Sequence, residues 1–220
     1  MSDLKLNLKK KIWITSDTHY GHKNLCRGST NWCTKDGEIP IGSTRDFNSL
    51  DKMNDTIVNN INSCVEEDDI LIHAGDLSFG GVENIKKFIK KLNVKEIHFV
   101  NGNHDSNIEK NRENTQDLFT SVHTRIDLQY NKTLIIIDHY PLLSWKKQRR
   151  GSIMLHGHSH LVGDSRFGFG KKMDIGIDGH PEFRPYNLER EIIPLMEKRD
   201  VISEYSTIFD HHINKTKYKQ

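Results

Sequence analysis

The stretch of sequence that decides the fold lies near the N-terminus and reads Lys11-Ile12-Trp13-Ile14-Thr15-Ser16-Asp17-Thr18-His19. Its first half is short, apolar and partly β-branched, which predicts a buried β-strand. An aspartate and a histidine, two side chains that commonly bind metals, follow immediately at positions 17 and 19. The segment therefore predicts a strand whose end carries metal ligands.

The same arrangement occurs four more times along the chain. After each further predicted strand comes a polar side chain of a metal-binding type: Asp76, then Asn103 with His104, then His139, then His158 with His160. Strand ends in an open α/β sheet meet at one edge, where ligands bind, so we expect these side chains to gather there. Carboxylate, amide and imidazole together suit Mn, Fe, Zn or Ni. Seven of these groups would oversupply one tetrahedral site, which predicts two ions.

Helical periodicity separates the strands in the first half of the chain. Apolar residues recur at helical spacing over 45–65 and 82–92, and more weakly within 109–119. Strands are expected at 11–15, 70–72 and 96–100. Alternation of strand and helix is typical of a layered α/β domain.

The second half of the chain is predicted to be rich in strands. Residues 122–128 and 133–138 flank a polar turn and indicate a β-hairpin, and further strands are expected at 153–156 and 172–177. A helix over 188–198 should bend or end at Pro194, and a last helix is expected over 201–213. We expect a single domain over 1–220, with two packed sheets, outer helices, a core at about 11–200 and a flexible tail at 214–220.

Charge and cysteine content narrow the class of protein. The 32 basic and 30 acidic residues nearly cancel, which argues against capture of nucleic acid or an anionic membrane by the whole surface. The three cysteines have no zinc spacing and predict free thiols in a reducing compartment. No stretch has the pattern of a signal peptide or a membrane span, so we expect a soluble, cytoplasmic protein without a membrane partner.

Five motifs between about residues 12 and 180 stand in a fixed order: Asp17-Thr18-His19, Gly75-Asp76, Gly102-Asn103-His104-Asp105, His139 and Gly157-His158-Ser159-His160. In this order they resemble the motifs of the calcineurin-like metallophosphoesterase superfamily. The opening at residues 16–22 is similar to that of its small single-domain members from bacteria and bacteriophages. The resemblance implies a four-layer α/β/β/α sandwich, in which two packed mixed sheets are flanked by helices and hold a dinuclear metal centre.

The resemblance also implies a role for each matched residue. One metal would be held by Asp17, His19 and His160, the other by Asn103, His139 and His158, with Asp76 bridging both. His104 would stand beside the leaving group as the catalytic histidine. Two divalent ions, with Mn favoured, would then supply a bridging hydroxide for in-line attack on a phosphate ester.

One departure from the superfamily bears on the substrate. Protein serine/threonine phosphatases carry an arginine in the second motif, whereas this chain reads Gly75-Asp76-Leu77-Ser78-Phe79-Gly80-Gly81. Without that arginine a protein phosphatase is disfavoured, and we expect a small phosphodiester or nucleotide-like substrate. The alternatives are a phosphomonoesterase, a nuclease that binds nucleic acid along a basic groove, and, least favoured, a metal-binding scaffold without catalysis.

Several further residues are candidates for a role around the metals or the substrate. Asp105 would either orient the His104 imidazole or cap the following turn. His22 lies on the loop that leaves the first ligands and has either a pocket role or a structural one. Asn54 is expected on the inward face of a helix, either as a partner of the metal site or as a packing amide.

Two basic or aromatic segments are further candidates for contacts with a substrate. Arg27, Trp32 and Arg45 belong to the long segment around 28–45, where they could stack on and pair with a nucleotide. The run Lys146-Lys147-Gln148-Arg149-Arg150 is either a solvated loop or a positive lip beside the metals.

Overall fold

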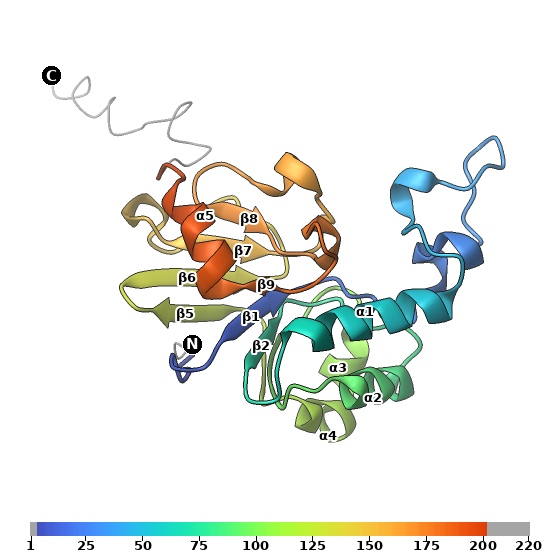
Figure 1. Ribbon diagram of the computed structural model, residues 1–220, viewed down its shortest axis with the longest axis horizontal. Coiled ribbons are helices and arrows are strands. Elements are labelled where there is room, and N and C mark those ends of the chain that lie inside the picture. The colour runs from blue at the N-terminus through green and yellow to red at the C-terminus, as the bar shows by residue number, and fades with distance from the viewer. Residues whose placement is uncertain (1–3, 202–220) are drawn as a thin grey trace, which may run out of the picture.

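The computed structural model describes residues 4–201, and its first sheet has five strands (Figure 1). Their order across the sheet is β4-β3-β2-β1-β9. The strands are β1 (Ile12–Thr15), β2 (Ile70–His73), β3 (Glu96–Val100), β4 (Ser121–His123) and β9 (Tyr186–Asn187). β1 to β4 run parallel and β9 runs antiparallel to β1, so β1, β2 and β3, which precede four of the seven predicted ligands, end at the same edge.

The second sheet has four strands in the order β5-β6-β7-β8. They are β5 (Ile126–Tyr130), β6 (Thr133–Asp138), β7 (Ile153–His156) and β8 (Lys172–Asp174). β5 and β6 form an antiparallel hairpin, whereas β6, β7 and β8 pair in parallel. Both sheets are therefore mixed.

The two sheets face each other across one apolar core. Alternate residues of each strand point into it, because successive side chains of a strand lie on opposite faces. In β1, Ile12 and Ile14 belong to the core between the sheets, whereas Trp13 belongs to the cluster on the helical side. Ile72, Ile135 and Leu155 are fully buried in the same inner core.

Helices cover the other face of the five-stranded sheet (Figure 1). They are α1 (Leu50–Cys64), α2 (Val82–Lys91), α3 (Ser106–Lys110) and α4 (Arg112–Thr115). Ile57 of α1 and Phe88 of α2 pack in one cluster with Phe99 of β3. α1 begins after Ser49, whose side chain accepts the backbone N–H of Lys52 as an N-cap.

The remaining helix and the outer face of the second sheet complete the layers. α5 (Ile193–Glu197) follows a π-helical turn at Leu188–Ile192 and contributes Met196 to the core between the sheets. Leu142 and Trp145 cover the outer face of the four-stranded sheet. The predicted fold class, two mixed sheets with flanking helices, is confirmed. Within residues 4–201, none of the helices combines the length and apolar character needed to cross a membrane.

Some predicted boundaries were wrong. The predicted strand 122–128 is divided: β4 belongs to the first sheet and β5 to the second. The predicted helix 45–65 starts only at Leu50, because the backbone of Arg45 and Phe47 accepts hydrogen bonds from Arg27 and Gly28. The predicted helix within 109–119 is replaced by α3, α4 and a 3₁₀ turn at Gln116–Leu118.

Further differences lie toward the C-terminus. The strand expected over 172–177 ends at Asp174, and the two-residue strand β9 was not predicted. Pro194 stands in the first turn of α5, directly after the π-helical turn, so the predicted helix 188–198 changes its type next to the proline. The predicted tail at 214–220, and the predicted helix 201–213 apart from Val201, lie outside the described residues.

Candidate metal centre

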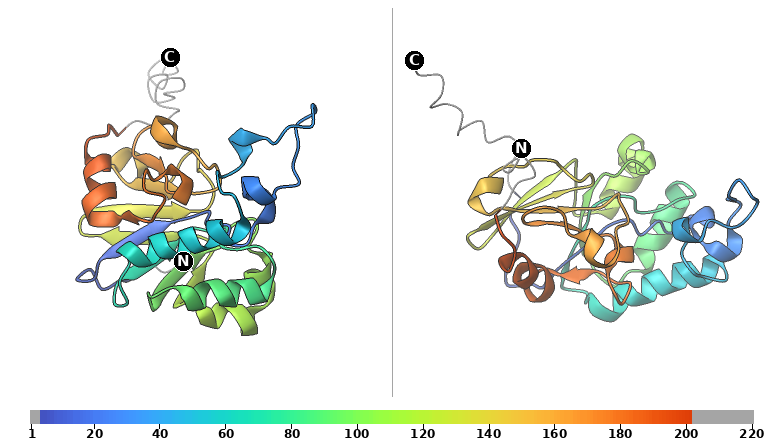
Figure 2. Two further views of the ribbon diagram at one scale, coloured as in Figure 1. Left: turned by 45° about the vertical axis from the view of Figure 1, so that its right-hand side comes forward. Right: turned by 90° about the horizontal axis from the view of Figure 1, so that it is seen from above.

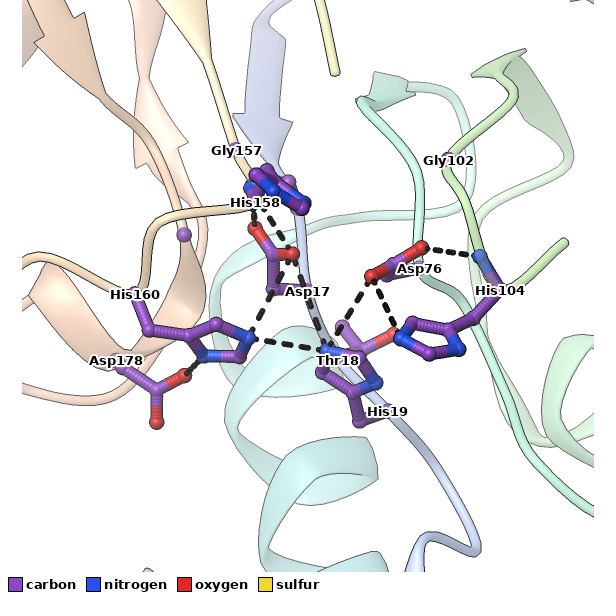
Figure 3. A network of polar contacts seen from close by, with 12 residues as sticks. Asp17, Thr18, His19, Asp76, Gly102, His104, Gly157, His158, His160 and Asp178 are labelled. Carbon is purple, nitrogen blue, oxygen red and sulfur yellow. Dashed lines mark hydrogen bonds and ion pairs between the residues drawn. The ribbon is translucent and has the colours of Figure 1, made fainter. Parts of the chain in front are cut away.

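The ligands predicted after the strands come together in two groups (Figure 3). Asp17, His19 and His160 form one group, and Asp76, His139 and His158 form the other. In each group the three ligand atoms lie within 4.8 Å of one another. Each group brings together one carboxylate and two imidazoles, a combination that suits a borderline divalent cation.

Asp76 faces both groups, with one carboxylate oxygen directed to each. Its Oδ2 lies 3.6 Å from Nε2 of His19, and its Oδ1 lies 3.6 Å from Nε2 of His139. A carboxylate has two oxygens and a negative charge, so this placement is the one that a bridge between two cations needs. Asp76 is also 2% exposed, which keeps water away from the carboxylate.

Asn103 completes the second group. Its Oδ1 lies 2.9 Å from Nε2 of His139 and 2.8 Å from Nδ1 of His158. The structure therefore brings all seven predicted ligands to one place, although they come from five separate segments of the chain.

The backbone of the ligand loops adopts a conformation that is uncommon for residues with a side chain. Of the eight non-glycine residues with positive φ in residues 4–201, five are predicted ligands: Asp17, His19, Asp76, His158 and His160. Left-handed backbone costs free energy and collects at functional sites, where the surrounding structure enforces it. The strain is thus concentrated where the ligands must point inward together.

Two glycines allow these loops to approach one another. A Cβ atom at Gly102 would lie 2.3 Å from Oδ1 of Asp76, and one at Gly157 would lie 2.4 Å from Oδ2 of Asp17. Any larger residue at either position would displace a ligand carboxylate.

Hydrogen bonds fix the orientation of two of the imidazoles. Nδ1 of His139 lies 2.9 Å from the carbonyl oxygen of Ala74, to which it can only donate. Nδ1 of His160 donates to Oδ2 of Asp178 at 2.7 Å. In both rings Nε2 is left with its lone pair directed into the site, as a metal ligand requires.

Asp178 and Arg45 hold residues of the first group in position through hydrogen bonds. The Arg45 guanidinium binds Asp178 through Nε and Nη2, both at 2.7 Å. It also donates hydrogen bonds to the carbonyl oxygens of Thr18 and Asp17, at 2.8 and 2.6 Å. Burial alone would raise the pKa of Asp178, but the Arg45 charge and the His160 hydrogen bond outweigh it and hold that pKa well below its usual range.

The contacts of Arg45 bear on its predicted role of pairing with a nucleotide. Because Arg45 is 7% exposed and engaged with Asp178 and two carbonyls, it holds the ligand loop and is not free to pair with a substrate. Asp178 itself was missed from the sequence. It follows the last predicted strand, so the same strand-end pattern would have indicated it.

Replacement of Asp178 tests this support. We expect Asp178→Asn to weaken metal binding and lower activity by roughly 10- to 100-fold, the usual cost of losing a partner of a ligating histidine. The neutral amide would no longer fix the His160 tautomer or balance Arg45. Metal affinity by calorimetry and activity at saturating metal check this result. Unchanged affinity, with Asp164→Asn on the exposed loop as the control, would contradict the positioning role.

Asp105 plays neither of the roles predicted for it. Its carboxylate accepts the backbone N–H groups of Asp76 at 2.6 Å, Leu77 at 3.0 Å and Gly102 at 2.7 Å. Within residues 4–201, its side chain makes no capping bond to α3 and no hydrogen bond or ion pair with the His104 ring. Asp105 therefore ties the loop after β2 to the loop after β3, and burial raises its pKa to about 6.

Asn54 and His22 shape the loop that follows the first ligands. Oδ1 of Asn54 on α1 accepts the backbone N–H of Gly21 at 2.8 Å, so it positions that loop. Nδ1 of His22 accepts the N–H of Leu25 at 2.9 Å, which leaves Nε2 protonated in the neutral ring. The His22 ring centroid lies 5.6 Å from that of His19 and 5.7 Å from that of Trp32.

The other basic side chains that were considered as contacts for a substrate are engaged elsewhere. Arg27 pairs with Asp46 at 2.7 Å and binds Thr44, so it holds its own loop and is not directed to a substrate. In the basic run, Lys146 pairs with Asp127 at 2.9 Å. Lys147 and Arg150 line a hollow at the β5–β6 turn, whereas His139 follows the opposite end of β6. Lys146, Lys147 and Arg150 therefore do not form the positive lip that was predicted beside the metals.

His104 lies beside the bridge without belonging to either group. Its backbone N–H donates to Oδ1 of Asp76 at 2.9 Å, while its Nε2 stays 4.0 Å from Oδ2 (Figure 3). Its side chain is 46% exposed, unlike those of His19 and His139. His104 is thus accessible to a ligand that approaches the two groups.

The charge state of the buried ligands fits a cation. Burial raises the pKa of Asp17 to about 6, and the charge of His160 and the hydrogen bond from Ser16 offset this rise only in part. Burial also lowers the pKa of His19, so its imidazole is neutral, the form that binds metals. A divalent cation at the first group would stabilise the carboxylate while leaving the neutral imidazole as it is. The residues present therefore fit a metal.

The fold and the two candidate ligand groups agree with the family that the sequence matches. The model of the calcineurin-like phosphoesterase family matches residues 10–178, and the chain belongs to this family. It is 28% identical over 198 residues to an uncharacterised protein of Methanocaldococcus jannaschii, a match that covers 88% of this chain and 95% of the relative. A crystal structure of a protein of unknown function from Aquifex aeolicus is similar in fold, with a TM-score of 0.60 and 18% identity over 84% of this chain and 99% of the other.

Proposed function

We propose that this chain hydrolyses a phosphodiester or a nucleotide-like phosphate ester with the help of two divalent metal ions. The observation that carries the proposal is the position of Asp76, whose two oxygens face two separate groups of ligands 3.6 Å away on either side. Such a pair of sites suits a phosphoryl group, because two cations can contact both the attacking and the leaving oxygen.

The residues of the site would have separate roles in this reaction. Asp17, His19 and His160 would hold one ion, Asn103, His139 and His158 the other, and Asp76 both. Bound ions would lower the pKa of a shared water and neutralise charge on the phosphoryl oxygens. His104, exposed beside Asp76, would stabilise the transition state or donate a proton to the leaving oxygen. Asp105, Asp178 and Arg45 would hold the ligand loops in register.

The metal and the compartment are part of the same proposal. Among the cations that suit this ligand set we favour manganese, with Fe, Zn or Ni as alternatives. Cys26, Cys33 and Cys64 are all free, which supports a reducing compartment and hence a cytoplasmic location.

Diester hydrolysis is expected to exceed monoester hydrolysis by roughly tenfold or more in kcat/KM. A dianionic monoester needs more positive charge than a monoanionic diester, and both arginines predicted for this purpose, Arg27 and Arg45, are paired with carboxylates. The measurement compares bis-p-nitrophenyl phosphate with p-nitrophenyl phosphate at equal Mn loading.

Protein stripped with a chelator serves as the control and should hydrolyse neither compound. A tenfold preference for the monoester would overturn the assignment to diesters. Hydrolysis that persists after removal of the metals would count against the metal-dependent function itself.

A further inference from the structure

A cavity of about 520 Å³ opens directly beside the first group of ligands. His160 and its partner Asp178 form one wall, and the segment around 28–45 forms the other, through Trp32 and Ser43. In Figure 2 this segment projects from the body of the molecule beyond α1. The volume lies in the range of pockets that take small organic ligands.

Part of the cavity wall away from the metal ligands is apolar and partly exposed. Trp32 is 40% exposed and Val162 is 57% exposed, and both line the cavity together with Leu25. A chain of ring contacts connects Trp32 to the metal site, since the His22 ring lies 5.7 Å from Trp32 and 5.6 Å from His19. A ring that stacks on Trp32 would therefore belong to a molecule whose other end can reach the ligands.

The charges that line the cavity already balance one another. Arg45 and Asp178 pair at 2.7 Å, and Asp178 also binds His160. No other side chain lining this cavity, among the residues that the structure describes, is an acid, a lysine or an arginine. A further phosphate group of the substrate would have no unpaired lysine or arginine to contact in this cavity. An uncharged ring, in contrast, would lose little solvation free energy on entering it.

We infer that this cavity binds the organic part of the substrate, and that this part carries a flat, uncharged ring that stacks on Trp32. The inference rests on the proposed function, because the phosphate of the same molecule would lie at the metal ligands. It narrows the substrate from phosphate esters in general to esters of a nucleoside-like alcohol. A polynucleotide, with a phosphate on every neighbouring unit, fits the cavity less well.

The test compares two esters that differ in the ring and not in the bond that is broken. Thymidine 5′-phosphate and glycerol 1-phosphate, each as the monoester and the methyl diester, all release a primary alcohol. The protein should prefer the thymidine compounds, and Trp32→Ala should lower kcat/KM for them by roughly tenfold, mainly through KM, as expected when one base–aromatic stack is lost. The glycerol compounds should be hydrolysed as before.

Two variants serve as controls. Trp32→Phe retains an aromatic face and should keep most of the preference. Ile41→Ala alters a 68% exposed residue of the same segment that does not line the cavity, and it should change neither ester. Equal effects of Trp32→Ala on both compounds, or no preference for thymidine in the unaltered protein, would overturn the inference.

Binding of thymidine itself, measured by calorimetry, separates this inference from the proposed function. Saturable binding that Trp32→Ala weakens would support the cavity assignment even if none of the four esters were hydrolysed, in which case only the proposed function would fail. Absence of thymidine binding together with hydrolysis of the esters would leave the proposed function standing and overturn the cavity assignment.

Discussion

Asp76→Asn is expected to lower kcat/KM by roughly 10³-fold or more, since two metals together stabilise a phosphoryl transition state by several kcal/mol. The substitution keeps the shape of the side chain but removes its negative charge. Asp76 faces both ligand groups at 3.6 Å, so both would bind their ions more weakly, and at least one ion should be lost. Activity at saturating Mn and metal content per chain are the two measurements.

A matched control separates this effect from general damage to a buried aspartate. Asp69 is 5% exposed and accepts a hydrogen bond from Nε1 of Trp13 at 2.9 Å, away from the two ligand groups. Asp69→Asn should lower the thermal unfolding temperature and leave the metal content unchanged. If Asp76→Asn retained two ions and full activity, Asp76 would not be the bridge.

His104→Ala is expected to leave the ions and the fold in place while kcat falls by roughly 10²- to 10⁴-fold, the range for a lost general acid. The loss should depend on the leaving group. A nitrophenolate leaves readily without a proton, whereas a nucleoside or alkyl alkoxide, with a much higher pKa, does not. The variant should thus be impaired most on alkyl and nucleoside esters. Steady-state rates on both kinds of ester, at matched metal occupancy, check this expectation.

Three outcomes distinguish the possible roles of His104. Selective impairment on alkyl esters supports proton donation, whereas equal impairment on both kinds of ester would limit His104 to positioning the phosphate. Loss of one ion would show that it is a ligand. His123→Ala, which alters a half-buried histidine bound to Ser121 in β4, is the control and should leave the rates unchanged.

The sequence predicted which polar residues lie close together better than it predicted the boundaries of the strands and helices. Each of the seven predicted ligands follows a short apolar strand, and parallel strands within each of the two sheets end on the same side, where such residues gather. The strand between 122 and 128 was predicted less well, because its apolar residues do not reveal that the chain passes from one sheet to the other within it. β9 has only two residues, which is too few for an alternating pattern of apolar and polar side chains to be recognised.

The residues around the ligands were the least predictable. Arg45 and Asp178 are 133 positions apart in the chain, and their pairing depends on how the loop before α1 packs against the loop after β8. The sequence shows that an arginine is present at position 45, but only the packing shows that its charge is already paired with Asp178. The same holds for Asp105, whose three backbone partners come from two different loops.

The central claim is that two metal ions lie between these seven ligands, and a crystal structure with anomalous scattering recorded from Mn-loaded protein tests it most directly. The account predicts two anomalous peaks, one among Asp17, His19 and His160 and one among Asn103, His139 and His158, with Asp76 in contact with both. A single peak at full Mn occupancy, or ions bound elsewhere on the chain, would contradict it.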